Sequence, residues 1–455
     1  MNARDVKTIE QAKEIVEQRE LQHVKVGVFD ADGILRGKYM AKEKFFSALD
    51  SGFGFCDVVL GWDSKDQLYD NVRYTGWHTG YPDAPTRIIP DTCRDLPYEN
   101  QGLFFLAEFY QDAEPLCPRG VLRKVIERAR AMGFEPFSAF EYEFFVFQET
   151  RESVREKHYR DLKPLAPGFF GYSVLRNSVD LEIYQEILAL GEAMDFPIEG
   201  LHEETGPGVM EAAIKVDSSL NSADKAGLFK TFAKVACQRN DLMATFMAKW
   251  SPDWPGQSGH IHISLKDKNG ASAFYDQKDK NGMSETMRHF VGGQQKLMPE
   301  LLAMVAPTVN SYTRLIPGFW APTHSTWGVE NRTCALRVIP GSEKSQRVEY
   351  RVAAADANPY IILSAALASG LYGIENKIEP EKQVSGNAYD QQFPEELRLP
   401  ANLWEAAQRL KASKMAADWF GKDFVEHFAA SREWEEREFR RAITDWELDR
   451  YFEII

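Results

Sequence analysis

The alternation of apolar and polar residues predicts much of the secondary structure along the chain. Residues 24–40, VKVGVFDADGILRGKYM, alternate on both sides of the turn at residues 30–33 and predict a β-hairpin. Apolar residues at helical spacing within residues 1–21 predict an amphipathic helix before the hairpin. Residues 121–132 predict another helix, which ends at Gly133, and the last fifty residues predict charged amphipathic helices. We therefore expect a mixture of strands and helices.

One predicted strand carries charges that its composition does not explain. Residues 138–147, SAFEYEFFVF, are aromatic or β-branched almost throughout, as in a buried strand. Side chains alternate between the two faces of a strand, so Glu141 and Glu143 point to the same side. Burying unpaired carboxylates is costly, and two like charges side by side add to the cost. A cation, a bound proton or water must therefore meet this pair.

Three further segments place polar side chains on otherwise apolar elements. They are the turn HEETGPGVME with Glu203 and Glu211 on either side, the strand at residues 256–265 with His260, His262 and Ser264 on one face, and the strand at residues 347–351 with Arg347, Glu349 and Arg351 on one face. Each pattern alone is common on a solvated strand face. Together they indicate one cavity lined by five glutamates and a histidine. Two or three divalent cations would neutralise it, and oxygen ligands favour Mg²⁺ or Mn²⁺.

Cationic residues are concentrated between residues 310 and 351, although the chain is acidic overall. They are Arg314, Arg332, Arg337, Lys344, Arg347 and Arg351. Guanidinium groups match carboxylates and phosphates, and metal ions with arginines are the equipment of phosphoryl transfer. The chain contains no GxxxxGK[ST] motif, which excludes a P-loop nucleotide site.

Composition limits the remaining classes of protein. A length of 455 residues with 44% hydrophobic residues allows two or three domains and a large core. The net charge of −14 argues against a general nucleic-acid binder. Five scattered cysteines without CxxC spacing are typical of a reducing compartment. Neither a signal peptide nor a membrane span is predicted, so we expect a cytoplasmic protein.

The order of the segments predicts two parts. A small α+β part comes first and includes a long irregular loop between Gly52 and Asp91, and a larger catalytic part built on antiparallel strands follows.

The motifs resemble those of the glutamine synthetase superfamily over nearly the whole chain. The matching stretches, in order, are EYEFF, HEETGPGVME, GQSGHIHISL, NSYTRLIPG, WGVENRTCALRV, RVEYR and ADANPY. NRTCALRV and the terminal DWELDRYFE look most like the branch of γ-glutamylpolyamine synthetase-like enzymes, which couple glutamate to amines.

This resemblance implies an α+β fold with an N-terminal β-grasp domain at residues 1–112 and a glutamine synthetase-type catalytic domain at residues 113–455. It also implies a homo-oligomeric ring, a hexamer or a stacked dodecamer, with active sites shared between neighbouring subunits. Asp63, in the irregular loop, would then act in a neighbour's site.

The resemblance also implies a role for each polar residue of the predicted cavity. One Mg²⁺ or Mn²⁺ ion would be held by Glu143, Glu203 and Glu211, and a second by Glu141, His260 and Glu349. ATP would contact His262, Ser264, Arg337 and Lys344. Glutamate and the transferring phosphoryl group would contact Arg314, Arg332, Arg351 and the backbone of Gly256. Of these, Arg332 and Arg351, together with Asp63, would be catalytic.

The implied reaction has two steps. The γ-carboxylate of glutamate takes the γ-phosphoryl group of ATP, and an amine then displaces phosphate to give a γ-glutamyl amide. Four positions depart from the ammonia-using members: Val209 replaces a glutamine, Pro255 an asparagine, Trp320 a flap glutamate and Trp77 an acidic residue. We therefore expect an amine pocket that includes Trp320 and Trp77, and a bulky hydrophobic or aromatic monoamine as substrate.

Three alternatives stay open. They are an ordinary glutamine synthetase that uses ammonia, a γ-glutamylpolyamine synthetase, and a non-catalytic relative that keeps only the fold. The intact set of expected metal ligands and arginines argues against the last.

Overall fold

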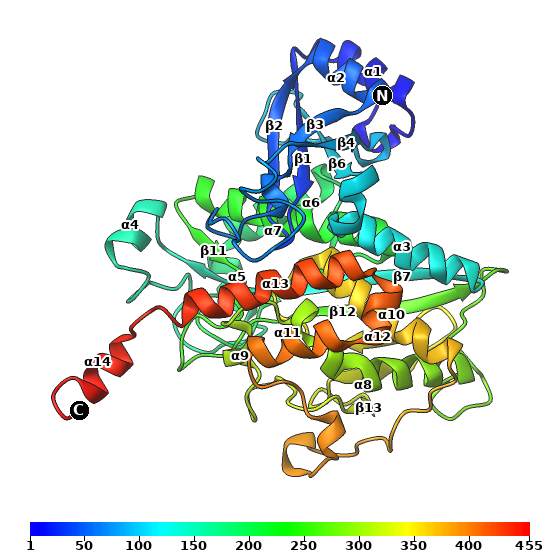
Figure 1. Cartoon of the computed structure of the whole chain (residues 1–455), viewed down its shortest axis with the longest axis vertical. Helices are drawn as coiled ribbons and strands as arrows, with labels where there is room; N and C mark the ends of the chain where they lie inside the picture. Colours follow the sequence, from blue (N-terminus) through cyan, green and yellow to red (C-terminus); the bar gives the residue numbers. More distant parts are fainter.

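The first of two β-sheets is formed by the N-terminal part of the chain (Figure 1). The computed structural model describes all 455 residues. The sheet has the strand order β2-β1-β6-β4-β3, and β5 pairs with β6. Its elements are α1 (Ile9–Gln18), β1 (His23–Phe29), β2 (Leu35–Ala41), α2 (Lys42–Ser51), β3 (Phe53–Cys56), β4 (Asp83–Ile88), β5 (Arg94–Asp95) and β6 (Leu103–Phe109).

The predicted hairpin forms as β1 and β2. Its turn is stabilised because the Asp30 carboxylate accepts hydrogen bonds from the backbone N–H groups of Asp32 and Ile34. Gly33 has a φ of 77°, a conformation that favours glycine. The expectation of one long irregular loop between residues 52 and 91 is partly wrong, since β3 and β4 lie at its two ends and pair with each other.

The second sheet has the strand order β13-β14-β15-β12-β7-β9-β8, with β10 and β11 also paired to β7. The long strand β7 contains the predicted strand with two glutamates. The strands are β7 (Phe134–Phe147), β8 (Ile198–Glu203), β9 (Val209–Ile214), β10 (Asp217–Ser218), β11 (Met243–Thr245), β12 (Gly259–Asp267), β13 (Trp327–Val329), β14 (Leu336–Ile339) and β15 (Arg347–Tyr350).

Helices cover one face of this sheet and leave the other to the charged residues. On β7, Phe140, Tyr142 and Phe144 are buried, and Tyr142 and Phe144 pack against Phe229 of α7. The helices are α3 (Pro118–Ala131), α4 (Arg151–Glu156), α5 (Val174–Val179), α6 (Leu181–Ala193), α7 (Ser219–Arg239), α8 (Glu285–Val305), α9 (Ser311–Arg314), α10 (Pro359–Glu375), α11 (Leu403–Ala412), α12 (Lys414–Trp419), α13 (Lys422–Phe439) and α14 (Asp445–Tyr451).

Helix α13 joins the two parts of the molecule. Arg432 donates to the carboxylate of Asp32 in the β1–β2 turn at 2.7 Å, and Trp434 packs edge-on against Tyr69. The loop that contains Asp63 is therefore fixed against the C-terminal part. The domain boundary expected at residues 112 and 113 stays a prediction.

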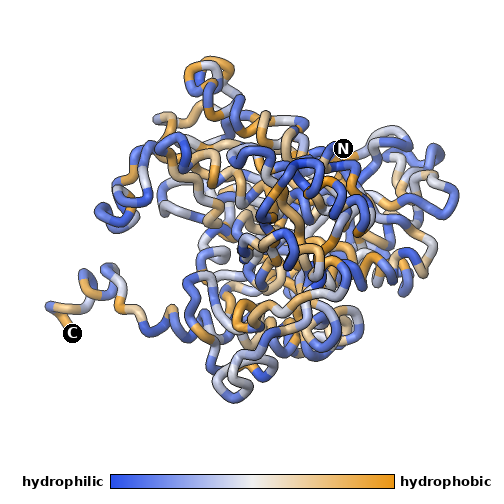
Figure 2. Tube along the Cα trace, turned by 90° about the horizontal axis from the view of Figure 1, so that it is seen from above, coloured by the Kyte–Doolittle hydropathy of each residue, from blue (hydrophilic) through white to orange (hydrophobic).

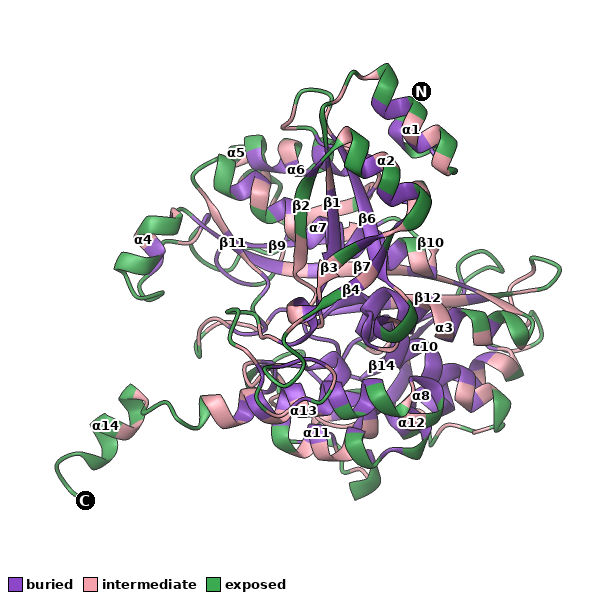
Figure 3. Cartoon of the chain, turned by 45° about the horizontal axis from the view of Figure 1, so that its top comes forward, coloured by how far each residue is buried: buried purple, intermediate pink, exposed green.

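The last helix, α14, extends away from the rest of the chain (Figures 1 and 2). It contains no buried residue, and it is drawn largely as exposed in Figure 3. No helix of the structure is both long enough and apolar enough to cross a membrane.

Candidate active site

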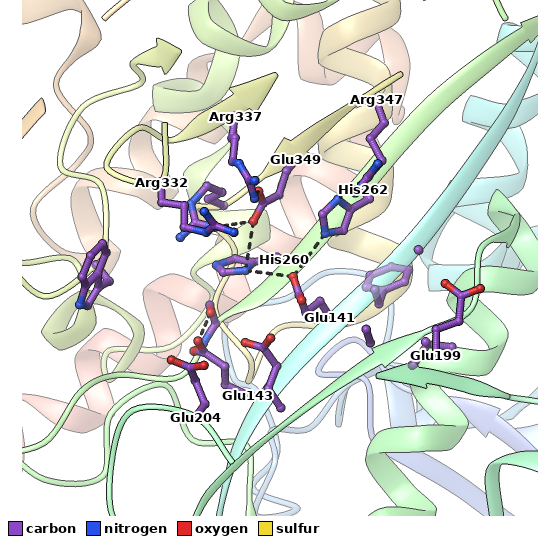
Figure 4. Close-up of a pocket in the computed structure, with 18 of the residues that line it drawn as sticks. Glu141, Glu143, Glu199, Glu204, His260, His262, Arg332, Arg337, Arg347 and Glu349 are labelled. Atoms are coloured by element: carbon purple, nitrogen blue, oxygen red, sulfur yellow. Dashed lines mark hydrogen bonds and ion pairs between the residues drawn. The ribbon is translucent and has the colours of Figure 1, made fainter. Parts of the chain in front are cut away.

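The charged face of the second sheet forms the floor of a cavity of about 680 Å³ (Figure 4). Its floor is formed by alternate residues of the strands β7, β9, β12, β14 and β15. Ala139, Glu141 and Glu143 of β7 face the cavity, whereas Tyr142 and Phe144 are buried in the core. The period of two that the sequence predicted therefore separates the cavity face of β7 from its core face.

One group of ligand-type side chains surrounds Glu141. His260 lies opposite Glu141 in the β12–β7 register, and its Nδ1 is 3.6 Å from Glu141 Oε2 and 3.4 Å from Glu349 Oε1 (Figure 4). The Nε2 of His262 is 3.3 Å from the same Glu141 oxygen. Since Arg347 Nε donates to Nδ1 of His262 at 3.2 Å, Nε2 carries the proton and donates to Glu141. This group contains the expected ligands Glu141, His260 and Glu349.

A second group lies one step along the sheet. Glu143 and Glu211 are opposite each other in the β7–β9 register. The backbone N–H and the hydroxyl of Ser258 both donate to Glu143 Oε2, at 2.7 and 2.6 Å, which fixes this carboxylate. The Nε2 of His202 is 3.4 Å from Glu211 Oε1 and 3.3 Å from Glu204 Oε2.

Glu203 does not belong to this group, which corrects the expectation from the sequence. In the β8–β9 hairpin His202 pairs with Glu211, so the side chain of Glu203 points to the opposite face. It is 3% exposed, and neither carboxylate oxygen has a hydrogen-bond partner. Burial raises its pKa. Glu204, not Glu203, lines the cavity.

The donor groups of the cavity fit divalent cations. Burial and the neighbouring carboxylates of Glu141 and Glu143 raise the pKa of Glu211, as expected where a positive charge is lacking. The Nε2 atom of His260 is buried without a hydrogen-bond partner. Two groups of three residues each bring ligand atoms within 4.8 Å of one another: Glu141, His262 and Glu349, and His202, Glu204 and Glu211. Carboxylates with few imidazoles favour Mg²⁺ or Mn²⁺.

The expected cationic residues all line the same cavity. Glu349 is buried and accepts hydrogen bonds from Arg337, at 3.0 Å, and from Arg351. Arg314 donates to the carbonyl oxygens of Val352 and Arg351, and burial lowers its pKa to about 10, so it stays charged at neutral pH. The remaining residues expected to contact ATP, glutamate or the phosphoryl group also line the cavity. They are Gly256, His262, Ser264, Arg332 and Lys344.

Aromatic side chains also contribute to the lining of the cavity. Trp320 lines it and is 59% exposed, with Phe319 beside it and Tyr172 also in the lining. Tyr172 stacks on His202, with ring centroids 4.4 Å apart.

Two residues expected in the site lie outside the cavity of their own chain. Asp63 accepts hydrogen bonds from the backbone N–H groups of Lys65 and Gln67 and so stabilises its own turn. Trp77 is 81% exposed and packs edge-on against Tyr81. Neither lines the cavity.

The sequence matches the model of the glutamine synthetase catalytic domain over residues 115–451. The chain belongs to the glutamine synthetase family. The prediction of this family from the motifs is confirmed, and the protein is a ligase of a family that uses ATP and divalent metal ions.

Relatives within this family include ligases for different amines. The chain is 46% identical over 439 residues to type-1 glutamine synthetase 2 of Dictyostelium discoideum, covering 95% of this chain and 84% of that one. It is 36% identical to a glutamate–isopropylamine ligase of a Pseudomonas species over 100% of both chains. It is 34% identical to the gamma-glutamylethanolamide synthetase GlnA4 of Streptomyces coelicolor, over 98% of this chain and 96% of that one.

A solved structure of GmaS without ligand superposes with a TM-score of 0.84 over 97% of this chain and 99% of that one, at 24% identity. This likeness confirms the predicted α+β glutamine synthetase fold.

Several cavity residues of this family member were missed by the sequence reasoning. They are Tyr172, Glu199, His202, Glu204 and Ser258. The sequence did contain a signal for His202 and Glu204, because they are two residues apart and so share one face of a strand. Ser258 could not be found, since its contact with Glu143 depends on how the end of β12 meets β7.

Proposed function

We propose that this family member is an ATP-dependent glutamate–amine ligase whose acceptor is an organic monoamine with an apolar body. The observation that carries this proposal is the aromatic part of the cavity lining, which includes Trp320, Phe319 and Tyr172. The names of the Pseudomonas and Streptomyces relatives support an organic amine. The name of the Dictyostelium relative favours the alternative, a glutamine synthetase that uses ammonia.

In the first step, a γ-carboxylate oxygen of glutamate attacks the γ-phosphorus of ATP, and ADP leaves. Arg332, in the cavity beside the Glu141 group, would neutralise charge on the transferring phosphoryl group (Figure 4). His262, Ser264, Arg337 and Lys344 would contact the nucleotide. Two groups of side chains would hold the metal ions, which when bound would draw charge from the phosphate oxygens: Glu141, His260 and Glu349, and Glu143, Glu204 and Glu211.

Glutamate would lie between the second metal group and the arginines. Arg314 and Arg351 would bind its carboxylates, since both guanidinium groups are held rigidly by hydrogen bonds within the protein. Gly256 gives room for this, because a Cβ atom there would lie 2.6 Å from the side chain of Arg314. Pro255 replaces an asparagine, so any contact with the α-amino group at this turn would come from the backbone.

In the second step, the amine nitrogen attacks the acyl carbon, phosphate leaves with the bonding electrons, and the nitrogen loses a proton. Trp320 has no anionic group to attract ammonium, and its indole N–H only donates. Its exposed ring instead gives an apolar surface for the body of the amine and weak cation–π attraction for its head. A diamine would bring a second cation that these aromatic rings do not pair, which disfavours polyamines.

Kinetics with a panel of amines tests the proposal. We expect a higher kcat/KM for branched alkyl or benzylic amines than for ammonium or putrescine, measured as amide formed. Trp320→Glu should lower the ratio of kcat/KM for the organic amine to kcat/KM for ammonium by at least about tenfold, equivalent to roughly 1.4 kcal/mol. The reason is that this change introduces an anion and removes the ring. Trp404→Glu, at an exposed position of α11, is the matched control. A wild type that prefers ammonium would restore the glutamine synthetase alternative.

A further inference from the structure

Lys249 is a buried cation between the two loops that border the reaction site. It is 7% exposed, and burial lowers its pKa. Its ammonium group donates to the backbone carbonyl oxygen of Trp254 at 2.6 Å. It also lies 4.7 Å from the centre of the Phe319 ring. The ammonium forms no ion pair with a carboxylate, so a carbonyl and an aromatic ring are its partners.

Both ends of the loop from Asn310 to Phe319 are attached to this one residue. The Asn310 side chain accepts a hydrogen bond from the backbone N–H of Lys249, at 2.9 Å, and donates one to its carbonyl oxygen, at 2.8 Å. At the other end, the ring of Phe319 lies on the ammonium. Trp320 follows with a φ of 58°, which is unusual for a bulky residue. The position of Trp320 is therefore set through Phe319.

The turn that contacts Lys249 on the side of the acyl donor, glutamate, is rigid. Trp254 packs against Phe145 of β7, and the backbone N–H of Gln257 donates to the carbonyl oxygen of Ala248 at 2.7 Å. These contacts close the turn that contains Pro255 and Gly256, where the glutamate backbone would lie. Lys249 thus connects a fixed turn at the acyl donor with an exposed segment at the acceptor.

We infer that Lys249 is a positioning residue that holds Phe319 and Trp320 over the acyl donor and so keeps water from the acyl phosphate. This inference rests on the proposed two-step reaction. When Phe319 and Trp320 are no longer held by Lys249, a water oxygen attacks the acyl carbon in place of the amine. The bond from that carbon to the phosphate oxygen then breaks. Glutamate and phosphate form without amide, so ATP is consumed without product.

The test compares phosphate released with amide formed in the same reaction. The wild type should give a ratio close to one with its best acceptor, and ammonium is included among the acceptors. Phe319→Leu removes the ring at a position that is 41% exposed, so folding should be unaffected. It should raise the ratio at least threefold and raise the KM for the amine more than that for glutamate. Lys249→Met should do the same, and the double variant should add little to either single variant.

Lys38→Met is the matched control, because its ammonium lies 5.1 Å from the ring of Phe55 and outside the cavity. Chymotrypsin cleavage after Trp320, followed by mass spectrometry, gives a readout without catalysis and should be at least threefold faster in Lys249→Met. Unchanged ratios in both single variants, or unchanged cleavage, would overturn the inference. A wild type that couples tightly only to ammonium would overturn the proposed amine instead and leave this test intact.

Discussion

At the residue scale, Glu203 and Glu204 are adjacent in sequence but lie in opposite surroundings. Glu204 faces the cavity within 3.3 Å of His202, whereas Glu203 is buried on the other face without a hydrogen-bond partner. A carboxylate among other carboxylates is stabilised by a metal ion, but a carboxylate in an apolar environment is destabilised by its charge. The two residues should therefore respond oppositely to loss of the negative charge.

Glu204→Gln should weaken Mn²⁺ binding by at least about tenfold and reduce amide formation on the order of 100-fold, since it removes a proposed ligand. Glu203→Gln should change Mn²⁺ binding less than threefold. Because burial raises the pKa of Glu203, the folded wild type loses stability as pH rises above the pKa of the unfolded carboxyl group. Glu203→Gln should therefore be more stable than the wild type at pH 8. Isothermal titration with Mn²⁺ and thermal unfolding measure the two effects. Equal loss of Mn²⁺ affinity in both variants would contradict the assignment.

At the element scale, the alternation on β7 and β12 was sufficient to predict which residues share the cavity face. The register of the β8–β9 hairpin could not be predicted in the same way, because the turn length decides which glutamate lies opposite its partner, and a slip of one residue reverses every side chain. The bond from Arg337 to Glu349 also escaped the sequence, since it depends on the pairing of β14 with β15. Strands are thus predictable from local pattern, whereas contacts across strands are not.

Helix α13 also contains a group that should make stability depend on pH. Burial raises the pKa of Glu435 to about 7, and the charge of Asp32 adds to this effect, although the nearby Arg432 lowers the pKa. Its stabilising contribution is complete below the pKa of the unfolded carboxyl group and is lost as pH rises through about 7. We expect the unfolding temperature to fall between pH 6 and pH 8. The free energy of unfolding should fall over this pH range by roughly 1 kcal/mol less in Glu435→Gln than in the wild type.

Differential scanning calorimetry at several pH values measures this effect. Glu426→Gln, on the same helix but exposed, is the control and should keep the slope of the wild type. A slope that is identical in Glu435→Gln and the wild type would contradict the prediction.

At the scale of the whole molecule, two exposed apolar surfaces are candidates for the subunit contacts of the expected ring. One includes Val174 and Leu175 of α5, which are 73% and 69% exposed, and the other follows α14 to Ile455, which is 94% exposed. Apolar patches of this kind mark interfaces. The expected ring would bury them and bring the loop with Asp63 to a neighbour's cavity.

Leu175→Asp combined with Val174→Asp should lower the molecular mass measured by analytical ultracentrifugation, because each substitution would place a charge in the interface. The dissociated protein should lose at least about tenfold in activity if the sites are shared. Trp404→Asp, at an isolated exposed position, should do neither. An active wild-type monomer would contradict both the ring and the shared site.

The position of Asp63 outside its own cavity has a consequence for mixtures of defective proteins. If Asp63 serves the neighbouring subunit, one chain with Asp63→Ala and another with Glu141→Gln are each inactive alone, but their defects fall in different subunits. Co-expressed in equal amounts, they would assemble at random, and about a quarter of the sites would combine an intact cavity with an intact neighbour. Two inactive alleles would thus complement each other within one oligomer. A cavity complete within a single chain would instead leave the chain with Asp63→Ala active by itself.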